Sequence, residues 1–279
     1  MRYGHEKSDG CGGLNMLKNV TCLLVTGLFL SSALAANENN MSIGQRFHYE
    51  SSYSDEGSKA ENPGWGKTVP LYKEYPGVEK VKLPVPTRTD ASLEKAVEER
   101  QSVRSFSDRG LTLAEVSRLL LTADGLTHSR GDWQMRSAPS GGALYPIDVY
   151  LVVSKVESLK PGLYHFQVSD SSLELVDAGD FSEQIHVASN EQSSVGSSPI
   201  TIVMTARFDR SITKYSDRGY RYTYMEAGCI CQNIYLQATA LKMGTVAVGA
   251  FNDDALNRFL KIDGRDEAGL LIMPVGYPK

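Results

Sequence analysis

The sequence is short of cysteine and histidine, and these shortages exclude several kinds of protein. Its 279 residues hold four Cys and five His without metal-ligand spacing, so neither a disulfide scaffold nor a structural zinc site is indicated. Lys and Arg total 29 against 33 Asp and Glu, a net charge of −4, which disfavours a nucleic-acid-binding protein. With 41% hydrophobic residues and a mean hydropathy of −0.27, the composition indicates a globular enzyme or small-molecule binder.

One uncharged apolar run lies near the N-terminus. Lys18 precedes residues 20–30, which carry no charge, and an Ala-x-Ala end follows. This pattern predicts a secretory signal peptide at residues 1–35, cleaved after Ala35, with Met16 as an alternative start. An uncleaved membrane anchor is the weaker alternative because the run is shorter than the ~20 apolar residues of a spanning helix. We therefore expect an exported protein, periplasmic or secreted, with no stable membrane span after cleavage.

Residues 36–89 are polar and interrupted by proline, which predicts an extended arm. The arm holds too many aromatic and apolar side chains for a plain linker, so some are expected to dock. An ordered domain is predicted at residues 90–279. The apolar and aromatic residues of the arm are Tyr49, Tyr53, Trp65, Leu71, Tyr72 and Tyr75.

Predicted helices and strands alternate along the domain, which indicates the α+β class with one mixed sheet. A short helix is predicted between Asp90 and Arg100, and a capping box of Thr112 and Glu115 predicts a second helix that stops at Gly125. Runs rich in β-branched residues predict strands. Strands are expected at 149–153, 200–206, 245–248 and 270–275, and further helices at 222–243 and after Asp253, with Leu93, Ala96, Val97, Leu256, Phe259 and Leu260 facing inward.

Arg100, Ser102 and Arg104 follow the first predicted helix. Two guanidinium groups with a hydroxyl between them suit a phosphate, because arginine binds phosphate through two parallel hydrogen bonds. The alternative is a solvated helix end, where cations are common.

A glycine pair lies in the loop at residues 139–146, just before a predicted strand. Glycine lets the backbone approach a planar or phosphorylated ligand closely. The loop is neither a Walker loop nor a Rossmann fingerprint, because no Gly-Lys-Ser/Thr follows it and it precedes a strand. An ordinary tight turn is the alternative.

Basic and aromatic residues interleave at positions 207–222, where Lys214 is followed by Tyr215. The segment suits a pocket for an anionic or aromatic ligand, and a Lys beside a Tyr can supply acid–base chemistry. A solvated loop is the alternative. Gly249 and Ala250 follow a predicted strand, in a turn that could aim backbone N–H groups at a ligand or serve only as a connection.

Together and in this order, these segments resemble the nitroreductase-like FMN flavoproteins, most closely the SagB/ThcOx-type dehydrogenases. Residues 100–106 resemble the superfamily's Arg-x-Ser-x-Arg-x-Phe opening. Residues 139–146, 161–166 and 214–222, and the segment Glu226-Ala227-Gly228 with Gln232-Asn233, resemble hallmarks of that branch.

The resemblance implies an α+β nitroreductase-like fold, with a mixed central sheet flanked by helices, in a homodimer with intertwined segments. It implies that non-covalent FMN lies at the subunit interface and that Lys214 and Tyr215 handle the substrate proton during hydride transfer. Lys279 is a candidate for a further phosphate-binding cation. The cofactor-binding residues implied are Arg100, Ser102, Arg104, Pro139, Ser140, Gly141, Gly142, Gly249 and Ala250.

The predicted function is that of an exported FMN-dependent oxidoreductase of the SagB-type dehydrogenase or nitroreductase kind. Its substrate would be small or peptide-like. Two alternatives stay open. One is a nitro- or quinone reductase that uses NAD(P)H as electron donor, and the other is a non-catalytic exported flavin-binding protein.

Overall fold

The computed structural model describes residues 41–54, 57–58, 69–86, 90–131 and 133–279. The predicted signal peptide at residues 1–35, with Met16, and the arm residue Trp65 lie outside the described residues. The chain divides into two compact units, Met1–Lys59 and Ala60–Lys279.

The described part of the first unit is small. Helix α2 (Ile43–Glu50) begins with a capping box, in which Ser42 and Gln45 satisfy each other's backbone N–H groups. Strands β1 (Tyr53–Ser54) and β2 (Gly57–Ser58) then pair antiparallel.

The second unit is built on a seven-stranded sheet in the order β10-β11-β9-β6-β7-β8-β3. Every pairing within it is antiparallel. The α+β class is therefore confirmed, although the sheet is not mixed. The strands are β3 (Lys80–Lys82), β6 (Ile147–Val153), β7 (Gly162–Gln167), β8 (Ser172–Ala178), β9 (Ile200–Arg207), β10 (Gly244–Thr245) and β11 (Glu267–Gly276), and a separate hairpin pairs β4 (Leu126–Arg130) with β5 (Trp133–Arg136).

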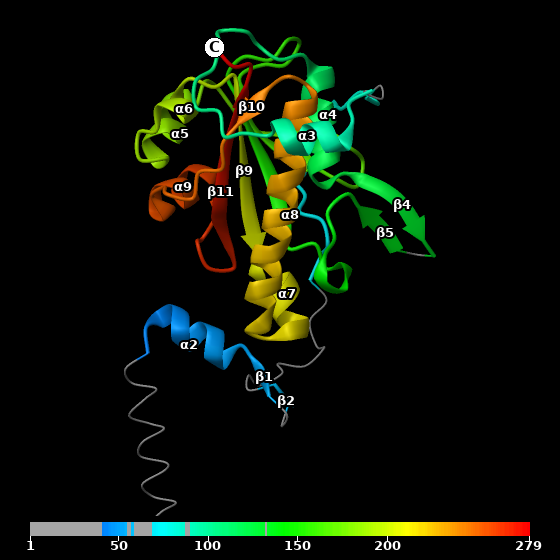
Figure 1. Cartoon of the computed structure of the whole chain (residues 1–279), viewed down its shortest axis with the longest axis vertical. Helices are drawn as coiled ribbons and strands as arrows, with labels where there is room; N and C mark the ends of the chain where they lie inside the picture. The colour runs from blue at the N-terminus through cyan, green and yellow to red at the C-terminus, as the bar shows by residue number, and fades with distance from the viewer. Residues whose placement is uncertain (1–40, 55–56, 59–68, 87–89, 132) are drawn as a thin grey trace, which may run out of the picture. The chain divides into compact units, whose positions relative to one another are not determined.

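Helices cover both faces of the sheet (Figure 1). The buried residues form two hydrophobic cores, one on each face of the sheet, because alternate side chains of a strand point to opposite faces. Val149 and Leu151 of β6 pack with α4 and α8, whereas Tyr150 and Val152 pack with α5, α6 and α9. No helix among the described residues has the length and apolar character needed to cross a membrane. The helices are α3 (Leu93–Glu99), α4 (Leu113–Asp124), α5 (Ser182–Ala188), α6 (Ser193–Gly196), α7 (Phe208–Tyr215), α8 (Arg218–Ala240) and α9 (Asp253–Leu260).

Helix α4 begins and ends where the sequence predicts. The Glu115 backbone N–H donates to Thr112 Oγ1 at 3.2 Å, and the Thr112 N–H donates to Glu115 Oε2 at 2.8 Å. Gly125 ends the helix without a left-handed φ. Glycine is needed there because a Cβ would lie 2.6 Å from the carbonyl oxygen of Leu121.

Other predicted elements are shifted or replaced. Helix α3 is capped by Ser92, and of its three predicted inward residues only Ala96 is buried, whereas Leu93 and Val97 are exposed. The predicted strand at 245–248 shrinks to β10 and one isolated bridge from Val248 to Ile272. Helix α9 is capped by Asn252, not Asp253, and buries Leu256 and Leu260 while Phe259 is partly buried. Residues 207–222, for which a solvated loop was the alternative to a ligand pocket, hold the end of β9, helix α7 and the start of α8. Strands β7 and β8 were not predicted.

The segment 69–86 belongs to the second unit, and β3 within it extends the sheet beside β8. Lys73 is the main attachment, because its Nζ lies 2.6 Å from both Glu267 Oε2 and the hydroxyl of Tyr150. The Tyr75 hydroxyl contacts that of Tyr150 at 2.9 Å. This part of the arm is therefore tied to the sheet by buried polar contacts.

Candidate active site

Lys214 and Tyr215, the predicted proton-transfer pair, lie against the loop that carries Gly142. Lys214 and Tyr215 end helix α7, and Gly142 belongs to a 3₁₀ turn at Gly141–Ala143. A Cβ placed on Gly142 would lie 2.6 Å from the Tyr215 hydroxyl and 2.8 Å from Lys214 Nζ. The rings of Tyr215 and Tyr222 pack edge to face at 4.9 Å. Residues predicted from two separate motifs thus form one group, which we call the Lys–Tyr–Gly cluster (Lys214, Tyr215 and Gly142).

The loop that carries Gly142 has a strained backbone. Gly142, Ala143 and Tyr145 have φ values of 66°, 54° and 46°, and positive φ is unfavourable for the two residues with a Cβ. Two contacts hold the loop at Tyr145. Its N–H donates to Ser140 Oγ at 2.8 Å, and its carbonyl oxygen accepts from Arg210 Nη1 at 2.9 Å. Strain of this kind persists only where the surroundings enforce it.

Arg210 is a buried cation with three kinds of partner. Its side chain is 2% exposed and donates to the carbonyl oxygen of Pro70 at 3.0 Å and to Asp148 Oδ1 at 3.1 Å, besides Tyr145. Burial disfavours the ionised form of Asp148, yet Arg210 and His165 hold the pKa of this carboxyl well below its usual range. Arg210 therefore joins the arm, the sheet and the loop through charge-assisted hydrogen bonds.

A second buried ion pair lies beside the same loop. Arg136 Nη1 is 2.6 Å from Asp124 Oδ2, and the Arg136 guanidinium lies 4.4 Å from the centroid of the Tyr145 ring. The Arg136 backbone N–H also donates to the Tyr145 hydroxyl at 3.3 Å. Tyr145 is thus fixed at its backbone, its ring and its hydroxyl.

Glu226 is a residue for which sequence reasoning assigned no role. It is 3% exposed on α8, and its Oε1 atom has no hydrogen-bond partner among the described residues. Burial raises the pKa of Glu226 to about 8, and the nearby Ser140 side chain opposes this rise. The sequence feature that could have pointed to Glu226 is the segment Glu226-Ala227-Gly228, which resembles a hallmark of the SagB/ThcOx-type branch.

Two residues of the predicted phosphate-binding segment, Arg100 and Ser102, contact Tyr235 of α8. The Arg100 guanidinium lies 5.1 Å from the centroid of the Tyr235 ring, and Ser102 Oγ is 3.1 Å from the Tyr235 hydroxyl. That hydroxyl also accepts from the N–H of Ala247 at 2.8 Å. Arg104 is exposed. The N–H of Lys279 donates to the carbonyl oxygen of Ser105 at 3.3 Å, so the backbone of Lys279 lies beside this segment.

The predicted backbone turn at Gly249 and Ala250 is exposed. The carbonyl oxygen of Ala250 accepts from Asn190 Nδ2 at 3.3 Å and from Gln192 Nε2 at 3.0 Å. A Cβ on Gly249 would meet open space. The turn is therefore held from the α5–α6 side and leaves Gly249 accessible.

The predicted residues do not all lie together within one chain. Gly141 contacts Tyr222, whereas Ser102 contacts Tyr235, thirteen residues further along α8. At 1.5 Å per residue these anchors lie about 20 Å apart along the helix. The Lys–Tyr–Gly cluster and the basic segment thus lie at different places along α8, and the turn at Gly249 follows Ala247, whose N–H donates to the same Tyr235 hydroxyl that Ser102 contacts.

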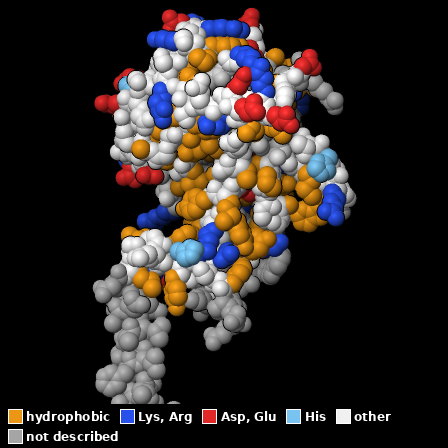
Figure 2. Space-filling view, in the orientation of Figure 1, with side chains coloured by type: hydrophobic (Ala, Val, Ile, Leu, Met, Phe, Trp, Pro, Cys, Tyr) orange, Lys and Arg blue, Asp and Glu red, His pale blue; other side chains and the backbone are white. Residues whose placement is uncertain are grey.

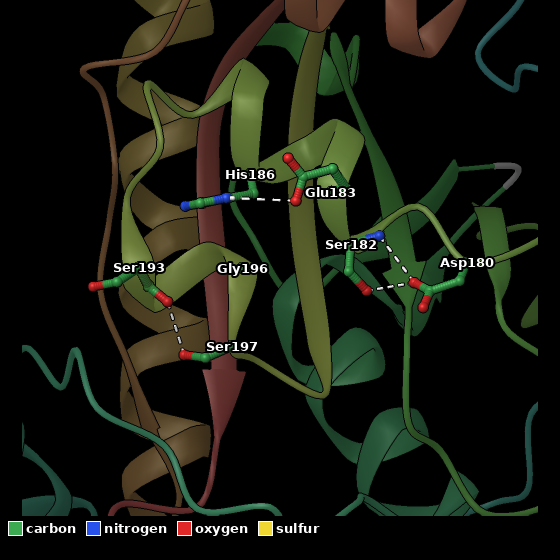
Figure 3. Close-up of a pocket in the computed structure, with 7 residues that line it drawn as sticks. All are labelled: Asp180, Ser182, Glu183, His186, Ser193, Gly196 and Ser197. Atoms are coloured by element: carbon green, nitrogen blue, oxygen red, sulfur yellow. Dashed lines mark hydrogen bonds and ion pairs between the residues drawn. The ribbon is translucent and has the colours of Figure 1, made fainter.

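A groove between α5 and α6 holds none of the predicted residues (Figure 3). His186 Nδ1 lies 3.9 Å from Glu183 Oε2, and Asp180 accepts hydrogen bonds from the N–H and hydroxyl of Ser182. These side chains satisfy one another and do not converge on a common point in the groove.

Comparisons with known proteins identify relatives over most of the second unit. The model of the nitroreductase family matches residues 97–277. A protein of Methanocaldococcus jannaschii named as a candidate nitroreductase is 36% identical over 196 residues, covering 70% of this chain and 96% of that protein. The microcin B17-processing protein McbC of Escherichia coli is 30% identical over 146 residues, covering 50% of this chain and 54% of McbC.

Solved structures share the fold. A candidate nitroreductase of Anabaena variabilis has a TM-score of 0.69 at 25% identity and covers 84% of this chain, which itself spans only 47% of that protein. A chain of the E. coli microcin synthetase McbBCD complex, with truncated pro-MccB17 bound, has a TM-score of 0.58 at 25% identity. That match covers 77% of this chain and 79% of the other. The predicted nitroreductase-like α+β fold is confirmed.

The buried position of Arg210 predicts a large loss of stability when it is replaced. Arg210→Met leaves Asp148 buried without its cation, and we expect unfolding to become easier by about 3–5 kcal/mol. Arg207→Met is the matched control, because Arg207 pairs with Asp209 at a partly exposed position, where the two side chains are 24% and 30% exposed, and its replacement should cost no more than about 1 kcal/mol. Urea unfolding measures both, and equal losses would contradict the role given to Arg210.

Proposed function

The chain belongs to the nitroreductase family, and on that premise we propose an FMN-dependent oxidoreductase of the SagB-type dehydrogenase kind. It would transfer hydride between a small or peptide-like substrate and bound flavin. The observation that carries the proposal is the convergence of Lys214 Nζ and the Tyr215 hydroxyl on Gly142, in an exposed loop. An amine and a phenol at one point can remove or return the proton that accompanies hydride transfer.

The chemistry of the donor groups fits FMN. Arg100, Arg104 and the Ser102 hydroxyl match a phosphate dianion, which arginine binds through paired N–H groups. Gly142 and Gly249 are both exposed and would let a flat ring approach the backbone. When bound, FMN would supply the two-electron acceptor for hydride.

The roles of the two catalytic candidates follow from their positions. Tyr215 would exchange the substrate proton through its hydroxyl, and Lys214, with Nζ 5.3 Å from the centroid of the Tyr215 ring, would stabilise or relay that proton. The similarity to McbC, a microcin-processing protein, supports a peptide-like substrate.

A nitro- or quinone reductase that uses NAD(P)H is the second candidate. The observation in its favour is the M. jannaschii relative named as a candidate nitroreductase, which this chain matches over 96% of its length. A flavin-binding protein without turnover is the non-enzymatic alternative.

We further infer a homodimer. Hydrophobic side chains gather on the face over α8 (Figure 2), where Tyr224 and Met225 are 49% and 64% exposed. A second copy packed on this face would cover them. It could also bring the basic segment of one chain toward the Lys–Tyr–Gly cluster of the other, which a single chain keeps about 20 Å apart along α8.

The cofactor assignment predicts a yellow protein when it is purified with FMN or reconstituted with it. Arg100→Ala combined with Arg104→Ala should weaken FMN binding at least about 10-fold, because each replacement removes a charge-assisted hydrogen bond. Arg130→Ala is the control, an exposed cation on β4. Quenching of FMN fluorescence measures the affinities. A wild-type chain that stays colourless and takes up no FMN would overturn the assignment.

The proton-transfer assignment predicts that Lys214→Ala retains FMN and loses turnover. Gly142→Ala should also lose about 10- to 100-fold, because a methyl group would displace both catalytic candidates. Gly77→Ala is the matched control, since Gly77 also has a positive φ (78°) but faces open space.

Reduction of bound FMN by NAD(P)H would favour the reductase, and reduction by a thiazoline peptide would favour the dehydrogenase. Full turnover in the Lys214 variant with bound FMN would contradict the assignment.

Export and dimerisation share one test. We infer from residues 18–35 that the chain is exported and cleaved after Ala35. Native mass spectrometry of the protein recovered from outside the cytoplasm should then give a dimer of chains that begin at Ala36. Recovery of the chain from the cytoplasm alone would contradict export, and an exported chain that keeps residues 1–35 would contradict cleavage after Ala35. A monomer at micromolar concentration would contradict the dimer.

A further inference from the structure

Tyr235 lies near the C-terminal end of α8 and carries a hydroxyl that the proposed reaction leaves unused. It is 8% exposed, and its hydroxyl contacts two segments that are far apart in the sequence. The N–H of Ala247 donates to this hydroxyl at 2.8 Å, and Ser102 Oγ lies 3.1 Å from it. Ser102 belongs to the predicted phosphate-binding segment, whereas Ala247 leads into the predicted backbone turn at Gly249 and Ala250.

The same two segments are joined through their backbones. Ser102 forms an isolated parallel bridge with Thr245, and the N–H of Val103 donates to the carbonyl oxygen of Thr245 at 2.9 Å. Gly244 permits this approach, because a Cβ there would overlap the side chain of Val103. The phosphate-binding segment and the chain that leads to the turn are therefore neighbours, and Tyr235 contacts both.

The direction of each hydrogen bond at Tyr235 follows from the available donors. A backbone N–H can only donate, so the Tyr235 oxygen accepts from Ala247. The Tyr235 hydrogen needs an acceptor, and Ser102 Oγ lies 3.1 Å away. Tyr235 therefore donates to Ser102, and the Ser102 hydrogen points elsewhere. Because Ser102 is exposed, its hydrogen can reach a ligand.

FMN carries its phosphate and its ring at opposite ends of one molecule. Two protein segments that bind these ends lose affinity when their separation varies, because binding must then restrict their motion. A hydroxyl that contacts both segments reduces that cost without touching the ligand. A hydroxyl that also directs the Ser102 hydrogen outward prepares a donor for a phosphate oxygen.

We propose that Tyr235 is a positioning residue for the cofactor. Its hydroxyl links the phosphate-binding segment to the turn at Gly249, and it fixes Ser102 as a donor to a phosphate monoester. Its ring separately supports Arg100, whose guanidinium lies 5.1 Å from the ring centroid. The effect on the cofactor rests on the proposed function, whereas the link between the two segments does not.

Tyr235→Phe tests the link, because phenylalanine keeps the ring beside Arg100 and removes the hydroxyl. Without FMN, the Ala247 amide should exchange its hydrogen at least about 10-fold faster in this variant than in the wild type, since its acceptor is lost. Ser102→Ala leaves that acceptor in place and should leave the exchange unchanged. Tyr164→Phe is the matched control, because Tyr164 is also buried and its hydroxyl donates to a backbone carbonyl at 2.8 Å, on β7.

Affinities for FMN and riboflavin then separate this role from a general loss of structure, because riboflavin lacks only the phosphate. Tyr235→Phe should weaken FMN binding about 5- to 10-fold and riboflavin binding less than about 2-fold. Ser102→Ala should do the same, and the double variant should resemble the single variants, since both changes break one chain of hydrogen bonds. Tyr164→Phe should change neither affinity. Quenching of flavin fluorescence measures all of them.

Equal exchange at Ala247 in the wild type and Tyr235→Phe, or equal weakening of FMN and riboflavin, would overturn the proposal. An Ala247 amide in the wild type that exchanges as fast as that of the exposed Gly249 would also overturn it, even if Tyr235→Phe folds poorly. A wild type that binds neither flavin, with faster exchange at Ala247 in Tyr235→Phe, would instead contradict the proposed function and retain the link between the segments.

Discussion

The arrangement of the candidate active site depends on one buried cation. Arg210 binds the carbonyl oxygens of Pro70 and Tyr145 and the carboxylate of Asp148. The arm, the loop and strand β6 therefore all bind the same guanidinium group. Its planar, forked set of N–H donors fixes how far these three segments lie from one another. The positive φ values at Ala143 and Tyr145 are unfavourable by themselves, so the buried ion pairs stabilise the loop shape against which Lys214 and Tyr215 rest.

The sequence was most informative where a local rule decides the structure. The capping box predicted α4, and runs rich in β-branched residues predicted β6, β9 and β11. Each of these signals lies within a few residues of sequence. The family resemblance assigned Gly142 to the cofactor and Lys214 and Tyr215 to proton transfer, and the structure adds that the three lie together. Periodicity alone could not have joined segments more than 70 residues apart.

The rest depends on tertiary contacts that a local pattern does not show. Strands β7 and β8 carry buried polar residues such as His165 and Glu174, which pair with each other at 2.9 Å and which hide the apolar alternation. Helix α7 was not predicted from its charged sequence, because Arg210 is buried there by distant partners. The burial of Glu226 could not be predicted from spacing, since the groups around it come from the loop, α4, β5 and α7.

The contacts of Arg210 also bear on the order in which the chain folds. Its partner Pro70 is 140 residues away and Tyr145 is 65 residues away, so both contacts close long loops at an entropic cost that local helices avoid. Pairing of β6 with β9, in which Ile147 lies opposite Ala206, already brings Tyr145 and Arg210 together, whereas the contact with Pro70 requires the arm to dock as well. The turn at residues 142–145 has no reason to adopt its strained shape until the sheet has formed and the arm has docked. The candidate active site would then take its final shape only after the sheet that supports it has formed.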